Sequence, residues 1–363
     1  MESAPEISRY VAADRSEVFA FLDAVHSKDF SARLQRQWDW KYDANPFNRD
    51  GQAYLLLWRD AGEIVGLLGI MPVRVCIDGT ERLVGHPCDW AMRPDHRGRR
   101  MARRLLDRQR PDWPLRFSWQ NELSRRLSPG MVGDNSGILP LATVVKPLAV
   151  GGLVEQATGS RLLAKLASAL AHATEPLGRW LRRQTGTSDV IVGETSEFDD
   201  RFDGLWQRVR REYPVMVVRD RRYLDWRFVQ RPDARYRILT ATRGSDVVGY
   251  LVMRVVEQDG ARRGYLVDFL VVERSTAIFS RLVTRAVVCI KRDRAQSIAC
   301  RAAVAPFRRG LFRQGFVPVR ERAPGYLRTY RPDVESPDRL ECLFQDPANW
   351  FLTMGDGDLE MSL

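Results

Sequence analysis

The segment from Asp89 to Ala102 carries residue types that can hold an anion. Its sequence predicts a strand up to Met92, a turn that starts at Pro94, and then a helix. The first amides of a helix have no partners within the helix and carry a partial positive charge, so they bind phosphate oxygens. Gly98 lets the backbone come close to an anion. Three side chains beside it add positive charge and support a phosphate-binding turn: Arg97, Arg99 and Arg100.

The chain carries the pattern around this segment twice. A helix end that starts with a tryptophan comes first. In both Trp40–Pro46 and Trp226–Pro232 a proline lies six positions after the tryptophan. A strand with a valine–glycine pair follows, and then a strand that opens with an aspartate and an aromatic residue, Asp89–Met92 in one copy and Asp268–Val271 in the other. An amphipathic helix ends each series. The same features in the same order predict two copies of one domain.

The elements expected in each copy form a mixed sheet. Antiparallel strands come first and a strand–helix–strand unit follows, which is typical of an α/β (α+β, mixed-sheet) fold. In the second expected helix, Trp38 and Tyr42 are four residues apart and share one face. The helices and strands predicted for the first copy are Ser16–Ala24, Phe30–Asp43, Tyr54–Trp58, Ile64–Val75, Arg82–Met92, Arg99–Arg108 and Leu115–Trp119.

A linker and a C-terminal tail complete the expected organisation. Apolar residues recur at helical spacing from Ser160 to Arg183, interrupted at Pro176, with arginines on the opposite side. Such a segment could lie on an anionic membrane surface, but linker helices packed on the domains are the favoured interpretation because short basic faces are common. The tail is expected to dock through Trp350. The predicted order is domain, linker, domain and tail: 1–150, 151–186, 187–332 and 333–363.

The strand–turn–helix segment resembles the GNAT acyltransferase superfamily, whose signature is Arg/Gln-x-x-Gly-x-Gly/Ala after a strand that ends Val-x-Pro. Met92 and Pro94 take the strand positions, Arg97 takes the first signature position and Ala102 the last. Arg100 stands where the family has its central glycine. An arginine there still offers its backbone N–H, although its side chain could crowd a pyrophosphate. The chain as a whole resembles tandem GNAT proteins.

This resemblance implies acyl-coenzyme A, expected to be acetyl-CoA, as the co-substrate. It also implies that only the first copy binds it, because Val272–Ala277 contains no glycine and places Glu273 near the expected phosphate position. The late segment Leu311–Phe316 is similar to the family's helix that ends in Gly-Phe. The cofactor-binding residues are expected to be Ala91, Met92, Arg97, Gly98, Arg99, Arg100, Met101, Ala102 and Asn121.

The implied reaction is direct attack of an amine on the thioester, which needs a base for the amine proton and N–H donors for the developing oxyanion. Asp89 is the first candidate base because it lies on the cofactor strand, and Glu122 is the second. The alternative for Asp89 is a structural role. Asp268 matches it in the copy expected to be inactive, so both carboxylates could simply tie a strand to a loop. His86 could also act, although a lone histidine is more often only hydrogen-bonded within the fold.

The composition limits the classes of protein that fit. Lys and Arg total 57 against 46 Asp and Glu, which gives a net charge of +11 and an attraction for anions. The arginines are spread along the chain without a nucleic-acid-binding motif, so a basic surface is favoured over specific nucleic-acid binding. Five scattered cysteines and four histidines predict no metal site and no disulfide framework.

The sequence predicts a cytoplasmic protein. No apolar run approaches the roughly 18 residues that a membrane-spanning helix needs. The first residues lack the basic start and apolar core of a signal peptide.

The leading function is therefore an acyl-CoA-dependent N-acyltransferase, with the acceptor expected to be a small-molecule or sugar amine. One alternative is a non-catalytic, degenerate GNAT tandem that binds a ligand or acts as a scaffold. Another is an aminoacyl-tRNA-dependent transferase of the related FemABX type, which would use the positive charge but not the phosphate turn. The sequence does not specify the acceptor, the acyl length or the oligomeric state.

Overall fold

The computed structural model describes residues 6–97, 101–120, 138–148, 189–258, 260–302, 305–319, 325–330 and 338–357. These residues form two compact units, and neither unit is contiguous in sequence. The first contains Met1–Pro140, Tyr213–Arg235 and Ala323–Phe351. The second contains Leu141–Glu212, Tyr236–Arg322 and Leu352–Leu363. The linker expected at 151–186, with its membrane alternative, lies outside the described residues.

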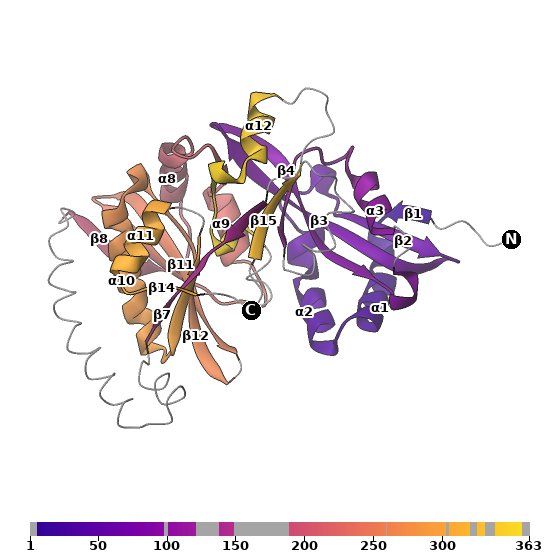
Figure 1. Cartoon of the computed structure of the whole chain (residues 1–363), viewed down its shortest axis with the longest axis horizontal. Helices are drawn as coiled ribbons and strands as arrows, with labels where there is room; N and C mark the ends of the chain where they lie inside the picture. Colours follow the sequence, from indigo (N-terminus) through magenta and orange to yellow (C-terminus); the bar gives the residue numbers. More distant parts are fainter. Residues whose placement is uncertain are drawn as a thin grey trace. The chain divides into compact units, whose positions relative to one another are not determined.

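The first unit is built on a mixed sheet, as the sequence predicts (Figure 1). Its main strand order is β1-β2-β3-β4-β5-β15-β6, while β9 pairs with β3 and β16 pairs with β9. The strands are β1 (Glu6–Arg9), β2 (Tyr54–Asp60), β3 (Glu63–Ile77), β4 (Thr80–Met92), β5 (Arg116–Gln120), β6 (Ile138–Leu141), β9 (Val215–Val217), β15 (Gly325–Tyr330) and β16 (Trp350–Phe351). The helices are α1 (Arg15–Val25), α2 (Lys28–Trp38), α3 (Met101–Gln109), α9 (Arg221–Phe228) and α12 (Arg339–Gln345).

The second unit repeats this plan with the strand order β14-β7-β13-β12-β11-β10-β8. Its strands are β7 (Thr143–Pro147), β8 (Val190–Thr195), β10 (Arg237–Arg243), β11 (Asp246–Gln258), β12 (Ala261–Val271), β13 (Ser297–Arg301) and β14 (Val317–Val319). Its helices are α8 (Arg201–Val209), α10 (Thr276–Arg292) and α11 (Ala305–Arg313). The parallel neighbours include β4 with β5 and β9 with β16 in the first sheet, and β12 with β13 in the second.

Each sheet takes a strand from the other half of the sequence. β15 pairs antiparallel with β5 along the whole of β5. β7 lies between β13 and β14, and Figure 1 shows it in magenta among the orange strands of the second sheet. The ranges 1–150 and 187–332 expected from the sequence are contiguous, whereas the compact units exchange these strands. Which partner a strand edge takes depends on tertiary contacts that periodicity does not encode.

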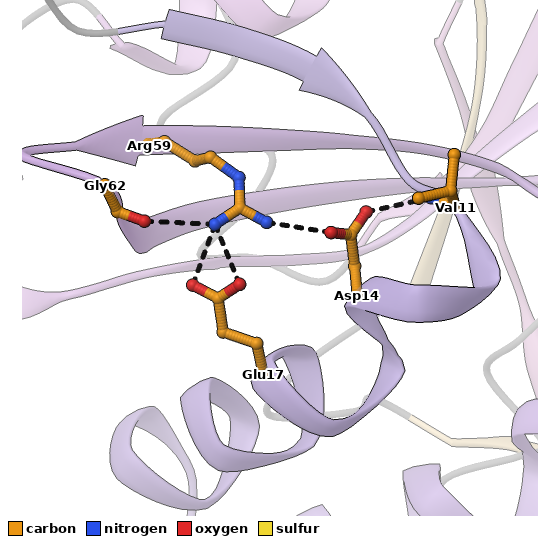
Figure 2. Close-up of polar contacts among 5 residues, drawn as sticks. All are labelled: Val11, Asp14, Glu17, Arg59 and Gly62. Carbon is orange, nitrogen blue, oxygen red and sulfur yellow. Dashed lines mark hydrogen bonds and ion pairs between the residues drawn. The ribbon is translucent and has the colours of Figure 1, made fainter.

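The start of α1 is fastened to the β2–β3 hairpin by one arginine. The Arg59 guanidinium donates to both oxygens of Glu17 at 2.8 Å, to Asp14 at 3.0 Å and to the Gly62 carbonyl at 3.1 Å (Figure 2). The other oxygen of Asp14 accepts the backbone N–H of Val11 at 2.9 Å. One nitrogen of the guanidinium contacts Glu17 and Gly62 and another contacts Asp14, so Arg59 ties the start of α1 to the hairpin.

The helix expected at Phe30–Asp43 has two parts. α2 starts at a Ser27 cap, whose hydroxyl accepts the N–H of Phe30, and ends at Trp38. A π-helical turn then covers Asp39–Asp43. The Trp38 and Tyr42 rings lie 4.8 Å apart, which confirms that they share a face. π turns often occur at functional sites, and this one contains Trp40, Lys41 and Tyr42.

The tail contributes to both units. In the first unit, Trp350 is 3% exposed and its indole N–H donates to the Phe344 carbonyl at 2.8 Å. Its ring lies 5.0 Å from that of Phe117. Leu352 and the residues that follow it belong to the second unit. Among the helices in the described ranges, none combines the length and the apolar character needed to cross a bilayer.

Candidate functional site

The strand β4 contains a bulge at Asp89 and Trp90. Ala91 pairs with Leu67 and Cys88 pairs with Gly69, so two residues of β4 face one residue of β3. Asp89 has a φ of 50°, in the left-handed region that aspartate tolerates better than most residues. A bulge of this kind bends a strand and redirects its side chains.

A buried lysine and a buried tyrosine hold Asp89. Its Oδ2 accepts from Lys41 Nζ at 2.6 Å and from Tyr42 Oη at 2.7 Å. The side chain of Lys41 is 2% exposed and that of Asp89 is 10% exposed. Burial, followed by the charge of Asp89, raises the pKa of Tyr42 well above its ordinary value, so its hydroxyl stays protonated and donates. The π turn brings Lys41 and Tyr42 to the same carboxylate.

Gly69 leaves the space that the Tyr42 ring occupies, so Gly69→Ala is expected to disrupt this contact. A Cβ there would lie 2.1 Å from Tyr42 Oη and 2.7 Å from Cζ. The buried ring would have to move away from Asp89. Overpacking of this kind lowers the free energy of unfolding by about 1–3 kcal/mol, which urea denaturation measures.

Gly66 on the same strand provides the matched control. A Cβ on Gly66 would come no closer than 3.4 Å to another atom, Met92 Cε. Gly66→Ala is expected to change the free energy of unfolding by less than about 0.5 kcal/mol. An equal fall in the free energy of unfolding in Gly66→Ala and in Gly69→Ala would contradict the role given to Gly69.

The strands β4 and β5 meet at one place and then separate. Gly85 and Arg116 form the one registered pair between these two strands in the described residues, and the Gly85 N–H donates to the Leu115 carbonyl at 3.1 Å. His86 is fully buried, and its Nδ1 lies 3.1 Å from the Phe117 carbonyl oxygen. A carbonyl only accepts, so Nδ1 carries the proton and donates. After this point β5 continues beside β15, and the end of β4 has no ladder partner in β5.

Ala91 and Met92 lie in this separating end of β4, and both are buried. The Arg93 N–H donates to the Val65 carbonyl at 2.9 Å, and a 3₁₀ turn follows at Pro94–His96. Arg97 comes next and is exposed to solvent.

Two contacts fasten the turn to the β2–β3 hairpin. The Arg93 guanidinium contacts Glu63 at 2.9 Å. His96 Nε2 lies 3.0 Å from Asp60 Oδ2. The end of β4 and the start of the turn are therefore fixed to the hairpin that pairs with β4.

The helix after the turn packs back on the sheet that precedes it. Leu105 of α3 is fully buried in one cluster with Met92, Trp58 and Trp113. The guanidinium of Arg104 lies 5.7 Å from the Trp58 ring centroid. A strand, a turn and a helix packed on that strand are the geometry that a phosphate turn needs.

Several predicted site residues share one chain segment in the structure. Asp89, Ala91, Met92 and Arg97 lie on β4 and its turn. The predicted residues Gly98, Arg99, Arg100, Asn121 and Glu122, and the side chains of Met101 and Ala102, lie outside what the structure describes. Gln120, at the end of β5, is 5% exposed.

Sequence reasoning missed Lys41 and Tyr42 as partners of Asp89. The available signal was the segment Trp40-Lys41-Tyr42, in which a lysine stands between two aromatic residues. In the second copy the matching aspartate has different partners. Asp268 is 1% exposed and accepts from Tyr250 Oη at 2.5 Å and from Thr353 Oγ1 at 2.6 Å. A tyrosine hydroxyl donates to the aspartate in both copies, as the structural alternative for these two carboxylates expects.

The comparisons with known proteins agree with this architecture. Residues 6–116 match the family model for the acetyltransferase (GNAT) domain. Both units have the GNAT fold in tandem. No curated protein matches the sequence.

Solved structures with the same fold span most of the chain. A probable N-acyltransferase from Enterococcus faecalis is 10% identical with a TM-score of 0.55, and the match covers 90% of this chain and 72% of that one. A GCN5-related N-acetyltransferase from Anabaena variabilis is 10% identical with a TM-score of 0.58 and the same coverage. N-myristoyltransferase from Saccharomyces cerevisiae, solved with bound myristoyl-CoA, is 10% identical with a TM-score of 0.55, covering 97% of this chain and 90% of that one.

Proposed function

We propose that this protein transfers an acyl group from acyl-CoA to an amine, and that the first unit holds the acyl-CoA. The observation that carries the proposal is the separation of β4 from β5 after Gly85, beside a bulge and before a turn into α3. An opening between two parallel strands gives an extended thioester arm access to backbone groups of β4. The turn at Pro94–Arg97 and the start of α3 supply positive charge for the phosphates.

In the proposed reaction the amine nitrogen attacks the thioester carbon, and the coenzyme A thiolate leaves as the amide forms. The backbone at Ala91 and Met92 is proposed to donate to the carbonyl oxygen as negative charge develops there. The amine must lose one proton to a base. Oδ2 of Asp89 already accepts two hydrogen bonds, so a base at this residue uses Oδ1. Glu122 is the second candidate.

Titration calorimetry with acetyl-CoA and with longer acyl-CoA tests the proposal. The full chain is expected to bind, and the relative affinities identify the preferred acyl length. Arg97 is exposed on the turn, so Arg97→Glu replaces an attractive charge by a repulsive one and is expected to weaken binding at least tenfold. The exposed Arg308 of the second unit is the control, and Arg308→Glu is expected to leave the affinity unchanged. A full chain that binds none of these thioesters would contradict the proposal.

The acetyl group and a small-molecule or sugar amine are the expected substrates within this proposal. A screen of amines with acetyl-CoA, followed by release of free thiol, tests both. Thiol release with a longer acyl-CoA but not with acetyl-CoA would keep the reaction class and change the donor.

A further inference from the structure

In the second unit, a carboxylate of the chain occupies the turn that follows β12. The two oxygens of Glu212 accept the backbone N–H groups of Glu273 at 2.7 Å and of Arg274 at 2.9 Å. This turn follows β12 as the Pro94 turn follows β4. Glu273 and Arg274 have φ values of 57° and 49°, so two successive residues take the left-handed conformation. The turn presents both amides to one anion, and that anion is Glu212.

Three amides at the start of α10, those of Ser275, Ile278 and Phe279, are also engaged within the chain. The Ser275 N–H donates to the Val272 carbonyl at 3.0 Å, and Ser275 Oγ accepts the N–H of Ile278 at 3.3 Å. The Phe279 N–H donates to the Ser275 carbonyl at 3.1 Å. The position that would receive phosphates in the second copy thus has five of its amides bonded to residues of the chain.

A second segment occupies the place where β12 and β13 part. Their last registered pair is Leu266 and Cys300. Beyond it, Thr353 forms an antiparallel bridge with Ala302, which follows β13, and donates its hydroxyl to Asp268 of β12 at 2.6 Å. The C-terminal chain therefore contacts both strands where they separate.

This C-terminal segment is buried and is held by a hydrogen bond between its own residues. Every residue from Leu352 to Gly357 is buried. The Thr353 N–H donates to Asp356 Oδ2 at 2.8 Å, and the Asp356 side chain is itself buried. Since the segment is part of the core and not a loose end, a ligand would have to displace it to enter.

We propose that the second unit carries a built-in substitute for acyl-CoA. The Glu212 carboxylate stands in for a cofactor phosphate, and Leu352–Gly357 stands in for the extended arm between the strands. The chain consequently binds one acyl-CoA, in the first unit. The inference rests on the proposed function, because the first unit defines which positions a cofactor would fill.

Hydrogen exchange resolved to single amides tests the Glu212 contact. Glu212→Ala is expected to accelerate exchange at Glu273 and Arg274 at least tenfold, because both amides lose their acceptor. Glu212→Gln keeps a carbonyl oxygen and is expected to restore part of the protection. Glu197, which is exposed in the same unit, is the control, and Glu197→Ala is expected to change neither amide. Unchanged exchange in Glu212→Ala would overturn the inference.

Hydrogen exchange of the full chain saturated with acetyl-CoA tests whether Leu352–Gly357 takes the place of the cofactor in the second unit. Protection of the backbone amides from exchange is expected to increase at residues 89–97 and to stay unchanged at 268–277 and 352–357. One acetyl-CoA molecule is expected to bind per chain. Binding of two acetyl-CoA molecules per chain, or faster exchange at 352–357 when acetyl-CoA binds, would refute the proposal of a built-in substitute. Binding of neither acetyl-CoA nor a longer acyl-CoA would contradict the proposed function instead, and the Glu212 variants would still decide whether that carboxylate holds the turn.

Discussion

Lys41→Met is expected to lower the free energy of unfolding by about 3–5 kcal/mol. Lys41 is 2% exposed and its Nζ lies 2.6 Å from Asp89 Oδ2, so the substitution leaves a carboxylate buried without its cation. Breaking a buried ion pair from one side costs this much because the remaining charge stays desolvated. Chemical denaturation followed by tryptophan fluorescence measures the loss.

A double variant separates the charge effect from simple loss of packing. Lys41→Met combined with Asp89→Asn removes both charges, and it is expected to recover a large part of the stability lost in Lys41→Met alone. Lys28 is exposed at the start of α2, so Lys28→Met is the matched control and is expected to stay within about 0.5 kcal/mol. A double variant as unstable as the single one would show that the ion pair is not the cause.

Asp89→Asn is expected to reduce kcat by about a hundredfold or more if Oδ1 of Asp89 takes the amine proton, since positioned bases contribute roughly 10²–10⁴-fold. An amide cannot accept that proton, while asparagine still tolerates the left-handed backbone at this position. The KM for acyl-CoA is expected to change little. Steady-state kinetics across pH, at a temperature where the variant stays folded, measure both constants.

Asp89→Gly distinguishes a base from a structural tie. Glycine adopts the left-handed conformation freely and so keeps the bulge without a carboxylate. If Asp89 is the base, Asp89→Gly loses as much kcat as Asp89→Asn, whereas retention of kcat within a few-fold would exclude this role. Asp50 is an exposed aspartate of the same unit with a φ of 53°. Asp50→Asn and Asp50→Gly are the controls and are expected to leave kcat unchanged.

Part of the candidate site can be predicted from the sequence because its elements are adjacent along the chain. The aspartate, the strand end at Met92, the turn at Pro94 and the helix that contains Leu105 follow one another along the chain. Apolar periodicity and a proline are enough to place them within a few residues. The duplication is visible for the same reason, since it repeats short local patterns. By itself, the sequence thus determined the mixed-sheet domains, their repetition and the position of the strand, turn and helix from Asp89 to Leu105.

Tertiary structure alone decided what those residues contact. Lys41 reaches Asp89 because a π turn replaces the expected α-helical end, and periodicity does not report a change in hydrogen-bond register. The exchange of β7 and β15 between the sheets depends on which strand edge is free when the chain folds. Glu212 accepts hydrogen bonds from two amides that lie 61 and 62 residues further along the chain. Such contacts arise from packing of distant segments, whose energy no local sequence pattern records.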